Sequence, residues 1–407
     1  MRKGNIVAGL DIGTSQVRLI VGELDPDGSV NIIGVGTSPS PGMKKGVIVD
    51  LDQTVEAINR AVSEAERMVG MSIDSTYVGL VGTQVNLINN RGVVAVTAED
   101  KEIRDEDVER VLQATKVLAL PSDREIIDIM PREFVVDGYD GIKDPVGMLG
   151  VRLEVDALII TGAITALRNL TRCVTRAELE IDGLILNAVA SAEVILSSDE
   201  RELGVCLVDI GAGTTEIAFF RQGTLQDLSV LPIGGDHITN DLSVGLRTTF
   251  DNAEELKIEH GYALSSMAFT EKKIQIKSIG RKEPHFISEN DISQFIEPRV
   301  QELLQLVAKE IDKMSGGESP PAGVVFTGGV SLLNGLVEMA EGMFSTSVRI
   351  SQPDYIGVQS PAYSTAVGLI RYIQRHGAVN VQKKPKARGV FQSLWIRVRN
   401  WFVELLD

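Results

Sequence analysis

The amino-acid sequence predicts an α/β protein built from two related halves, and three observations support this. Apolar runs rich in Val and Ile alternate with segments of helical periodicity. An apolar strand that ends in Asp-Ile-Gly and leads into two further strands occurs twice, at residues 5–36 and at 204–235. The length of 407 residues exceeds the roughly 250–300 residues at which a single core stops growing. The repeat therefore indicates an internal duplication whose two halves face each other.

The first copy of the repeat is expected to form a three-stranded meander, with DPDG as the turn before its third strand. A helix should follow over residues 52–69, where apolar side chains recur at helical spacing. Gly70 is placed to cap the C-terminus of this helix.

Between the two copies, residues 102–120 predict a charged amphipathic helix, and residues 125–147 predict strands with turns. The apolar run at 157–167 is far shorter than the roughly 20 residues that a membrane-spanning helix needs. We therefore interpret it as a buried strand that leads through a turn into a helix at about 166–180.

The elements after the second copy follow from the same patterns. We expect a helical region through 254–260, a basic irregular segment at 271–285, a long helix at 291–314, a buried strand with a glycine turn at 322–331 and a helix at 360–373. Polar, basic, Pro and Gly residues at 378–389 indicate an extended linker.

Composition excludes some classes of function. The net charge of −16 argues against a general nucleic-acid binder, which needs a basic face, so we expect no nucleic-acid partner. The four histidines show no HExxH or similar metal spacing, and Cys173 and Cys206 show no CxxC spacing. Together with the absence of a signal-peptide pattern, this favours a reducing cytoplasm.

Each strand that ends in Asp-Ile-Gly leads into a turn suited to phosphate. Glycines let backbone N–H groups approach a phosphate, and an aspartate at a strand end can hold hydrated Mg²⁺. One such turn alone is more often a plain hairpin, but two copies in a duplicated unit are specific. The first phosphate loop comprises Asp11, Gly13, Thr14 and Ser15, with Arg18 nearby, and the second comprises Asp209, Gly211, Gly213 and Thr214.

A third glycine turn follows the buried strand at 322–331. At Gly328 and Gly329 a bare backbone can lie flat against a base or a phosphate. Glu254 and Lys257 share one helix face and could clasp a ribose, although a surface salt bridge explains the same spacing equally well.

These motifs resemble those of the actin, heat-shock chaperone and sugar-kinase ATPases, in which two RNase H-like domains close over ATP and Mg²⁺. Within that superfamily, the chain resembles the FtsA family of bacterial cell-division proteins from residue 5 to about 376. The resemblance rests on the stretches ELGVCLVDIGAGTTEIAFF, NAEELKIEHG, GIKDPVGMLGVRLE, IEPRVQELL, VVFTGGVSLLNGL and YSTAVGLIRY.

The resemblance implies an actin-like fold around a nucleotide cleft, with ATP as the ligand. Asp11 and Asp209 would hold Mg²⁺ through water, and Arg18 stands where actin-like proteins often have lysine. The residues implied around the nucleoside are Gly234, Gly235, Glu254, Lys257, Gly328 and Gly329.

The resemblance also implies a division of the chain into domains. The first actin-like core domain would comprise 1–84, 162–203 and 362–377, with an FtsA-type subdomain inserted at 85–161. The second core domain would comprise 204–240 and 315–361, with an upper subdomain at 241–314. A linker at 378–389 and a membrane-targeting helix at 390–407 would follow.

Fast ATP turnover is not expected. Vigorous members of the superfamily carry Glu or Gln on the connecting helix to orient the attacking water, whereas this chain has Asn187 and Ala188 in that place. Glu193 lies too far along the helix for that role. Without a positioned water, hydrolysis lacks a large factor from orientation, so we expect slow or undetectable turnover.

Residues 390–407 form an amphipathic pattern. On a helix, the apolar side chains fall within an arc of about 140°: they are Phe391, Leu394, Trp395, Val398, Trp401, Phe402, Leu405 and Leu406. The segment 383–407 carries six basic and two acidic residues, opposite in sign to the whole chain. This pattern is typical of a helix that lies in the plane of an anionic membrane, although docking on the protein body is the commoner use of a terminal helix.

The resulting hypothesis is a structural adaptor. By resemblance, it would bind ATP, assemble into actin-like filaments on the cytoplasmic face of the inner membrane, tether the tubulin-like protein FtsZ at the division site and meet other division proteins there. The upper subdomain would receive the C-terminal peptide of FtsZ, with Arg299 as a candidate contact for an acidic peptide. The alternatives are a type IV pilus scaffold, a kinase of the same superfamily or a chaperone ATPase.

Overall fold

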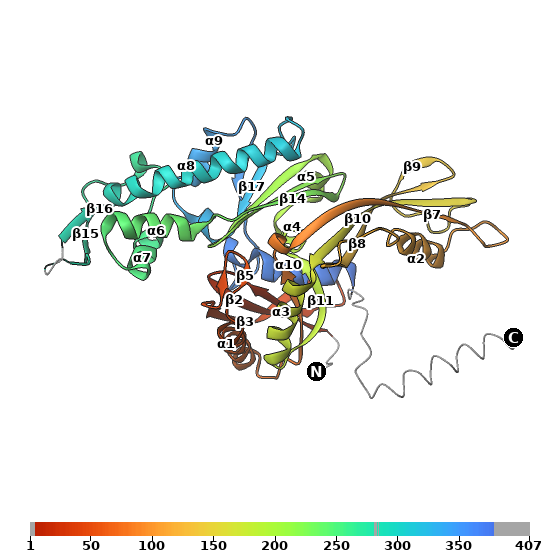
Figure 1. Ribbon diagram of the computed structural model, residues 1–407, viewed down its shortest axis with the longest axis horizontal. Coiled ribbons are helices and arrows are strands. Elements are labelled where there is room, and N and C mark those ends of the chain that lie inside the picture. Colours follow the sequence, from red (N-terminus) through yellow and green to blue (C-terminus); the bar gives the residue numbers. More distant parts are fainter. Residues whose placement is uncertain (1–4, 281–282, 284, 378–407) are drawn as a thin grey trace.

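The computed structural model of the chain describes residues 5–280, 283 and 285–377. Two five-stranded sheets form the centre of the molecule, one above the other in Figure 1, and an arm extends to each side of the upper sheet. Within the described residues, no helix is both long enough and apolar enough to cross a bilayer. The predicted linker at 378–389 and the predicted helix at 390–407 lie outside the described residues.

The first half is a sheet covered by helices on both faces. Its strands lie in the order β3, β2, β1, β6, β11, with β1 antiparallel to β2 and parallel to β6. Helices α1 and α3 pack on one face, and α4 and α10 pack on the other. The bounds are β1 Ile6–Ile12, β2 Gln16–Leu24, β3 Val30–Pro39, β6 Ser75–Leu80, β11 Glu180–Leu186, α1 Leu51–Val69, α3 Ile164–Arg176, α4 Asn187–Ile195 and α10 Ser364–His376. A small hairpin, β4 Met43–Lys44 and β5 Val47–Ile48, follows β3.

The second half repeats this topology. Its strands lie in the order β14, β13, β12, β17, β18, with β12 antiparallel to β13 and parallel to β17. The bounds are β12 Val205–Ile210, β13 Thr215–Arg221, β14 Thr224–Leu231, β17 Val324–Thr327 and β18 Val348–Ile350. The predicted internal duplication is therefore confirmed, strand by strand.

The right-hand arm of Figure 1 is a four-stranded antiparallel sheet in the order β7, β10, β8, β9, with one helix, α2, against it. The bounds are β7 Val85–Ala95, α2 Asp105–Ala114, β8 Arg124–Val136, β9 Tyr139–Ile142 and β10 Arg152–Ala163. We call this unit the inserted subdomain, because it interrupts the first half between β6 and α3. The expected helix at 102–120 is shorter than predicted at both ends. Thr115, directly after it, donates its hydroxyl to Leu112 O at 2.7 Å.

The left-hand arm joins to the second half. It contains α6 Gly235–Leu246, α7 Phe250–His260, the hairpin β15 Lys273–Ile276 with β16 His285–Ser288, and α8 Glu289–Met314, which continues through Pro298. A short helix, α9 Leu336–Glu341, follows β17. The prediction of an irregular segment at 271–285 is wrong for residues 273–276 and for residue 285, because β15 pairs with β16 and buries Ile276 against the core of the arm.

The predicted C-cap of α1 is confirmed. Gly70 adopts φ 71°, and its N–H bonds to Glu66 O at 2.8 Å, because a left-handed residue lets the chain turn back over the last helical carbonyls. At the other end, the carboxylate of Asp50 accepts a hydrogen bond from Gln53 N.

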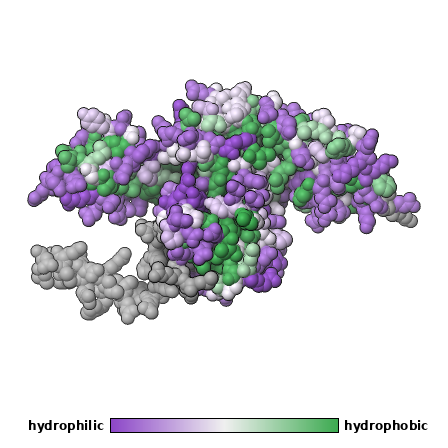
Figure 2. Space-filling view, turned by 180° about the vertical axis from the view of Figure 1, so that it is seen from behind, coloured by the Kyte–Doolittle hydropathy of each residue, from purple (hydrophilic) through white to green (hydrophobic). Residues whose placement is uncertain are grey.

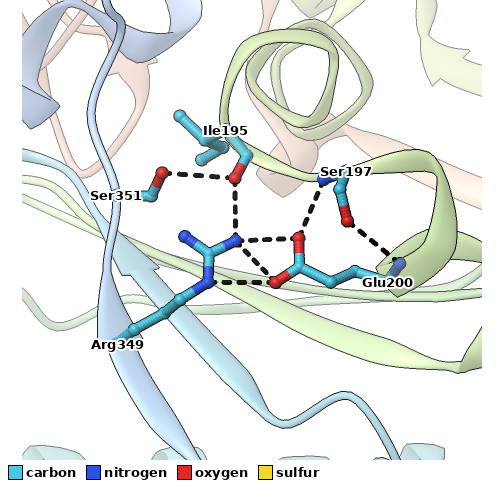
Figure 3. Close-up of polar contacts among 5 residues, drawn as sticks. All are labelled: Ile195, Ser197, Glu200, Arg349 and Ser351. Carbon is cyan, nitrogen blue, oxygen red and sulfur yellow. Dashed lines mark hydrogen bonds and ion pairs between the residues drawn. The ribbon is translucent and has the colours of Figure 1, made fainter.

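The chain crosses from the first half to the second at a corner between α4 and α5 Ser198–Leu203. A cluster of polar bonds holds this corner to β18 (Figure 3): Arg349 pairs with both carboxylate oxygens of Glu200 at 2.7 and 2.8 Å and also donates to Ile195 O at 3.0 Å. Ser351 donates to the same carbonyl, and Ser197 and Glu200 cap each other. The corner is thereby fastened to the far edge of the second sheet.

The surface reflects this arrangement. Figure 2 shows hydrophilic side chains along the outer edges of both arms, with hydrophobic patches on the central body and on the arm at the left of that view. The central body is where both sheets bury their apolar faces.

Candidate functional site

A cavity of about 350 Å³ lies between the two halves, which is a volume typical of small-ligand sites. Most of the residues predicted from the sequence line it: Asp11, Gly13, Thr14, Ser15, Arg18, Asp209, Gly211, Thr214, Gly235, Glu254, Lys257, Gly328 and Gly329. The structure thus brings three distant glycine turns and one helix pair to a single cleft.

Gly213 and Gly234 do not line the cleft. Each lets neighbouring segments pack closely behind the residues that do. A Cβ on Gly213 would lie 2.7 Å from the side chain of Thr14, so the two phosphate loops pack directly on one another. A Cβ on Gly234 would lie 2.5 Å from Gly211 O. Both glycines therefore set the spacing of the loops.

The two phosphate loops share one geometry. Gly13 N donates to Gln16 O at 3.0 Å, and Gly211 N donates to Thr214 O at 2.9 Å. In the strand register Asp11 faces Arg18, and Asp209 faces Glu216. The duplicated sequence therefore folds into duplicated turns, each with a carboxylate at the strand end.

Burial makes these carboxylates unusual. It raises the pKa of Asp11 to about 6, although the nearby Arg18 opposes the shift. Burial, together with the charge of Asp11, raises the pKa of Asp209 to about 7, and burial raises the pKa of Glu216 to about 8. A cation in the cleft would offset the cost of this concentrated negative charge.

The donors fit a magnesium ion that arrives with a phosphate. Across residues 5–280, 283 and 285–377, no three His, Cys, Asp or Glu side chains gather closely enough to hold a metal on their own. Mg²⁺ commonly keeps several waters and binds one or two carboxylates plus substrate phosphates. Two aspartates beside two phosphate loops match that coordination.

Arg18 is the cationic side chain beside the first loop. Its guanidinium lies over the ring of Tyr363, 5.5 Å from the centroid, and donates to Gln16 Oε1 at 3.1 Å. Its Nε is buried and has no partner among the described residues. Arg18 therefore retains a donor at the cleft.

The nucleoside side of the cleft contains the predicted helix pair on α7. Lys257 Nζ lies 2.6 Å from Glu254 Oε2 and donates to Thr239 Oγ1 at 2.8 Å and to Gly235 O at 3.3 Å. The two side chains form a salt bridge and also line the cleft, so the two interpretations of their spacing are compatible.

Gly328 lines the cleft. It has φ 85°, and a Cβ there would lie 2.3 Å from Asp209 Oδ1. A side chain would also be strained in this backbone conformation. Glycine at this position therefore lets the third turn contact the second phosphate loop.

Sequence reasoning missed several lining residues, among them Gly46, Glu216 and Thr365. Glu216 had a signal, since it is a charged residue within the apolar run TEIAFF of β13. Thr365 lies within the stretch YSTAVGLIRY that supports the family resemblance, but no role was assigned to it. Gly46 had no signal, because it reaches the cleft only through the pairing of distant elements.

Two residues weighed for catalysis occupy different places. Asn187 lines the cleft, and its Oδ1 is buried without a partner among the described residues. Glu193 is not a lining residue, because its carboxylate pairs with Arg201 at 2.8 Å and with Arg375 at 2.7 Å.

The candidate partner contact, Arg299, lies on α8. Its Nε is 2.6 Å from Asp241 Oδ2, and its Nη1 pairs with Glu302. The guanidinium therefore already has two carboxylate partners within this arm.

Comparison with known proteins gives a family. Residues 82–161 match the family described as an SHS2 domain inserted in FtsA, and residues 206–368 match that of cell division protein FtsA. The chain is 42% identical over 377 residues to the cell division protein FtsA of Pseudomonas aeruginosa, covering 91% of this chain and 90% of that protein. The chain belongs to the FtsA family of cell division proteins.

Other FtsA proteins are similar over nearly their whole length. The match with the Bacillus subtilis (strain 168) protein is 44% identical and covers 94% of this chain and 87% of that protein. The match with the Escherichia coli (strain K12) protein is 37% identical and covers 97% of each. The predicted family is therefore confirmed.

Solved structures give the fold. A PilM–PilN type IV pilus biogenesis complex has a chain with a TM-score of 0.63 at 17% identity, covering 89% of this chain and 97% of that one. MreB5 of Spiroplasma citri bound to ADP gives 0.55 at 14% identity, covering 91% and 97%. The actin-like fold with an FtsA-type insertion is confirmed.

Proposed function

We propose that this FtsA-family chain binds ATP with Mg²⁺ in the cleft, assembles into filaments on the inner membrane and tethers FtsZ there. The observation that carries the nucleotide part is the pair of matched phosphate loops, each with a buried aspartate, on opposite halves of one cleft. The nucleotide-bound state of MreB5 supports the same use of this fold.

Each wall of the cleft has a role in this proposal. The backbone N–H groups of both phosphate loops and the guanidinium of Arg18 would bind phosphate oxygens. Glu254 and Lys257 would contact the ribose, and Gly328 and Gly329 would lie against the base. Asp11 and Asp209 would hold Mg²⁺ through water, which neutralises phosphate charge when bound.

Slow turnover remains part of the proposal. Asn187 stands at the cleft where a stronger water-orienting group would be needed, and Glu193 is held by two arginines. We expect tight ATP binding with phosphate release far below tens per minute per chain. Steady release at tens per minute from a monodisperse sample would contradict this.

Attachment to the membrane is assigned to residues 390–407, on the sequence pattern alone. One such helix binds a bilayer weakly and reversibly, so many tails in a filament would be needed for stable attachment. FtsZ would be held through its C-terminal peptide at the arm that contains α8. Arg299 would contribute there only by exchanging its bonds with Asp241 and Glu302.

Vesicle sedimentation tests the tether. The full chain and a chain that ends at Val379 are mixed with anionic vesicles, Mg²⁺ and ATP, and FtsZ is then added to each. The full chain should sediment and recruit FtsZ, whereas the shortened chain should stay in solution. Equal sedimentation of both chains would end the tether model, and sedimentation without FtsZ recruitment would remove the FtsZ part of it.

The pilus scaffold is the weaker alternative. Its similarity at 17% identity shows the fold alone, and no feature of the cleft favours it. If vesicles that carry the full chain did not recruit FtsZ, the pilus scaffold would become the favoured alternative.

A further inference from the structure

The short helix η1 Gly82–Gln84 lies between the cleft and the inserted subdomain. It follows Val81, which lines the cleft, and it leads directly into β7, the first strand of the inserted subdomain. A three-residue segment thus connects the candidate nucleotide site to the subdomain that distinguishes this family.

Glu216 of β13, which lies beside the second phosphate loop, contacts η1. Gly82 N donates to Glu216 Oε1, and Glu216 lies beside Asp209 in the strand register. A Cβ on Gly82 would lie 2.7 Å from this oxygen and within 2.9 Å of side chains on β14. Backbone and carboxylate therefore meet only because residue 82 has no side chain.

The first phosphate loop touches η1 through Gly46, in the turn of the hairpin between β4 and β5. Gly46 N donates to Thr14 Oγ1 at 3.1 Å, and Gln84 Nε2 donates to Gly46 O at 3.1 Å. Gly46 itself lines the cleft and adopts φ 72°.

The inserted subdomain holds the far side of η1. Arg124, the first residue of β8, donates to Gln84 O at 3.3 Å and to Thr161 O of β10 at 3.1 Å. Hydrogen bonds therefore link η1 to Thr14 of the first phosphate loop through Gly46, to Glu216 beside the second phosphate loop, and to two strands of the inserted subdomain.

We propose that η1 is a relay: occupancy of the cleft by a metal-bound nucleotide fixes Thr14 and Glu216, and η1 passes this restraint to the inserted subdomain. This inference rests on the proposed nucleotide binding. A ligand shifts a protein only by binding its states differently. The ligand would contact Thr14 and Glu216 directly, and these are the two side chains that join the phosphate loops to η1.

Hydrogen–deuterium exchange on the full chain tests the relay, because amide exchange reports local opening. The probe is a non-hydrolysable ATP analogue with Mg²⁺ at saturation, and the observed amides are those of residues 82–95 and 124–136. In the unchanged chain, the analogue should slow this exchange at least threefold.

Gln84→Ala removes one bond of the relay from outside the cleft. The variant should bind the analogue with an affinity within about twofold of that of the unchanged chain. The analogue should nevertheless slow amide exchange in the variant by less than half as much as in the unchanged chain. Gln113→Ala, which alters an exposed glutamine of α2 in the same subdomain, is the matched control and should keep all of the slowing. At saturation, Glu216→Gln retains an acceptor for Gly82 N and should keep more of the slowing than Glu216→Ala.

The outcomes separate the two proposals. Full slowing in both Gln84→Ala and Glu216→Ala would overturn the relay and leave η1 as a static brace. Bound analogue with no slowing in the unchanged chain would overturn the relay alone. If calorimetry showed no binding of the analogue, both the relay and the nucleotide proposal would fall.

Discussion

Single residues in the cleft suit a charged ligand, but they lower the free energy of unfolding of the protein when no ligand is bound. The pKa of Asp209 is about 7 in the folded chain, against an ordinary value near 3.9 in an unfolded one. The folded state therefore binds more protons than the unfolded state between about pH 4 and pH 7. The free energy of unfolding must fall as pH rises through that window.

Asp209→Asn removes this effect. Without nucleotide, the variant should be more stable than the unchanged chain at pH 8 by at least about 1.4 kcal/mol, the equivalent of one pKa unit, and should match it near pH 4. Its affinity for Mg²⁺–nucleotide should fall at least tenfold. Urea unfolding at both pH values measures the first effect, with Asp140→Asn at an exposed position as control. Equal stability at pH 8 would show that Asp209 is not strained by burial.

Glu193 shows the opposite behaviour away from the cleft. Burial opposes its ionisation, but a hydrogen bond from His376 and the charges of Arg201 and Arg375 outweigh burial and lower its pKa to about 2. The stability that it contributes is present above its unfolded pKa and is lost as pH falls from about 4.5 toward 2.

Glu193→Gln should therefore lower the free energy of unfolding at pH 7 by about 3 kcal/mol, because two arginines lose a buried partner. The difference from the unchanged chain should shrink near pH 3. Nucleotide affinity and phosphate release should not change, since Glu193 does not line the cleft. A large fall in turnover with unchanged stability would instead make Glu193 a catalytic residue.

At the scale of elements, two helices of the first half cross at very short range. A Cβ on Gly368 of α10 would lie 2.1 Å from Ala190 O of α4, and Ser191 and Thr365 share a hydrogen bond of 3.0 Å across the crossing. Thr365 also lines the cleft, as does Asn187 at the start of α4. The spacing of the two helices therefore positions one wall of the site.

Gly368→Ala should force these helices apart. We expect a loss of about 1 to 3 kcal/mol in the free energy of unfolding, as for other overpacked cores, together with weaker nucleotide binding as Thr365 moves. Gly342→Ala, where a Cβ would lie 3.4 Å from its nearest neighbour, Met339 O, is the control. Denaturant unfolding and calorimetry give the two values. If stability fell but nucleotide affinity did not change, the crossing of the two helices would not position the wall of the site.

Elements with strong periodicity were predictable from the sequence. The expected helices at 52–69 and 291–314 became α1 and α8 within two residues at each end. The hairpin of β15 and β16 was not predicted. β15 reads KIQI and alternates polar and apolar residues, but each strand has only four residues, and β16, HFIS, does not alternate. Gly82 and Glu216 bond across 134 positions, a contact that no local pattern encodes.

At the scale of the whole molecule, the two halves face each other across the cleft, and the chain crosses between them at the corner between α4 and α5 and again between β18 and α10. The corner between α4 and α5 is fastened to the first half by Glu193 with Arg375 and to the second half by Glu200 with Arg349. The phosphate loops lie on opposite halves. A nucleotide that contacts both loops would therefore stabilise the halves as one unit.

Asp11→Ala and Asp209→Ala test this by altering one half each. A ligand at 100 times its dissociation constant stabilises its site by about 2.7 kcal/mol. At a fixed Mg²⁺–ATP concentration that gives this gain in the unchanged chain, each variant alone should lose most of it, because each loop supplies part of one site. Thermal unfolding with and without nucleotide measures the gain, and Asp140→Asn should retain it in full. If either variant kept the whole gain, the ligand would contact only one half. The interpretation that the nucleotide stabilises both halves as one unit would then be wrong.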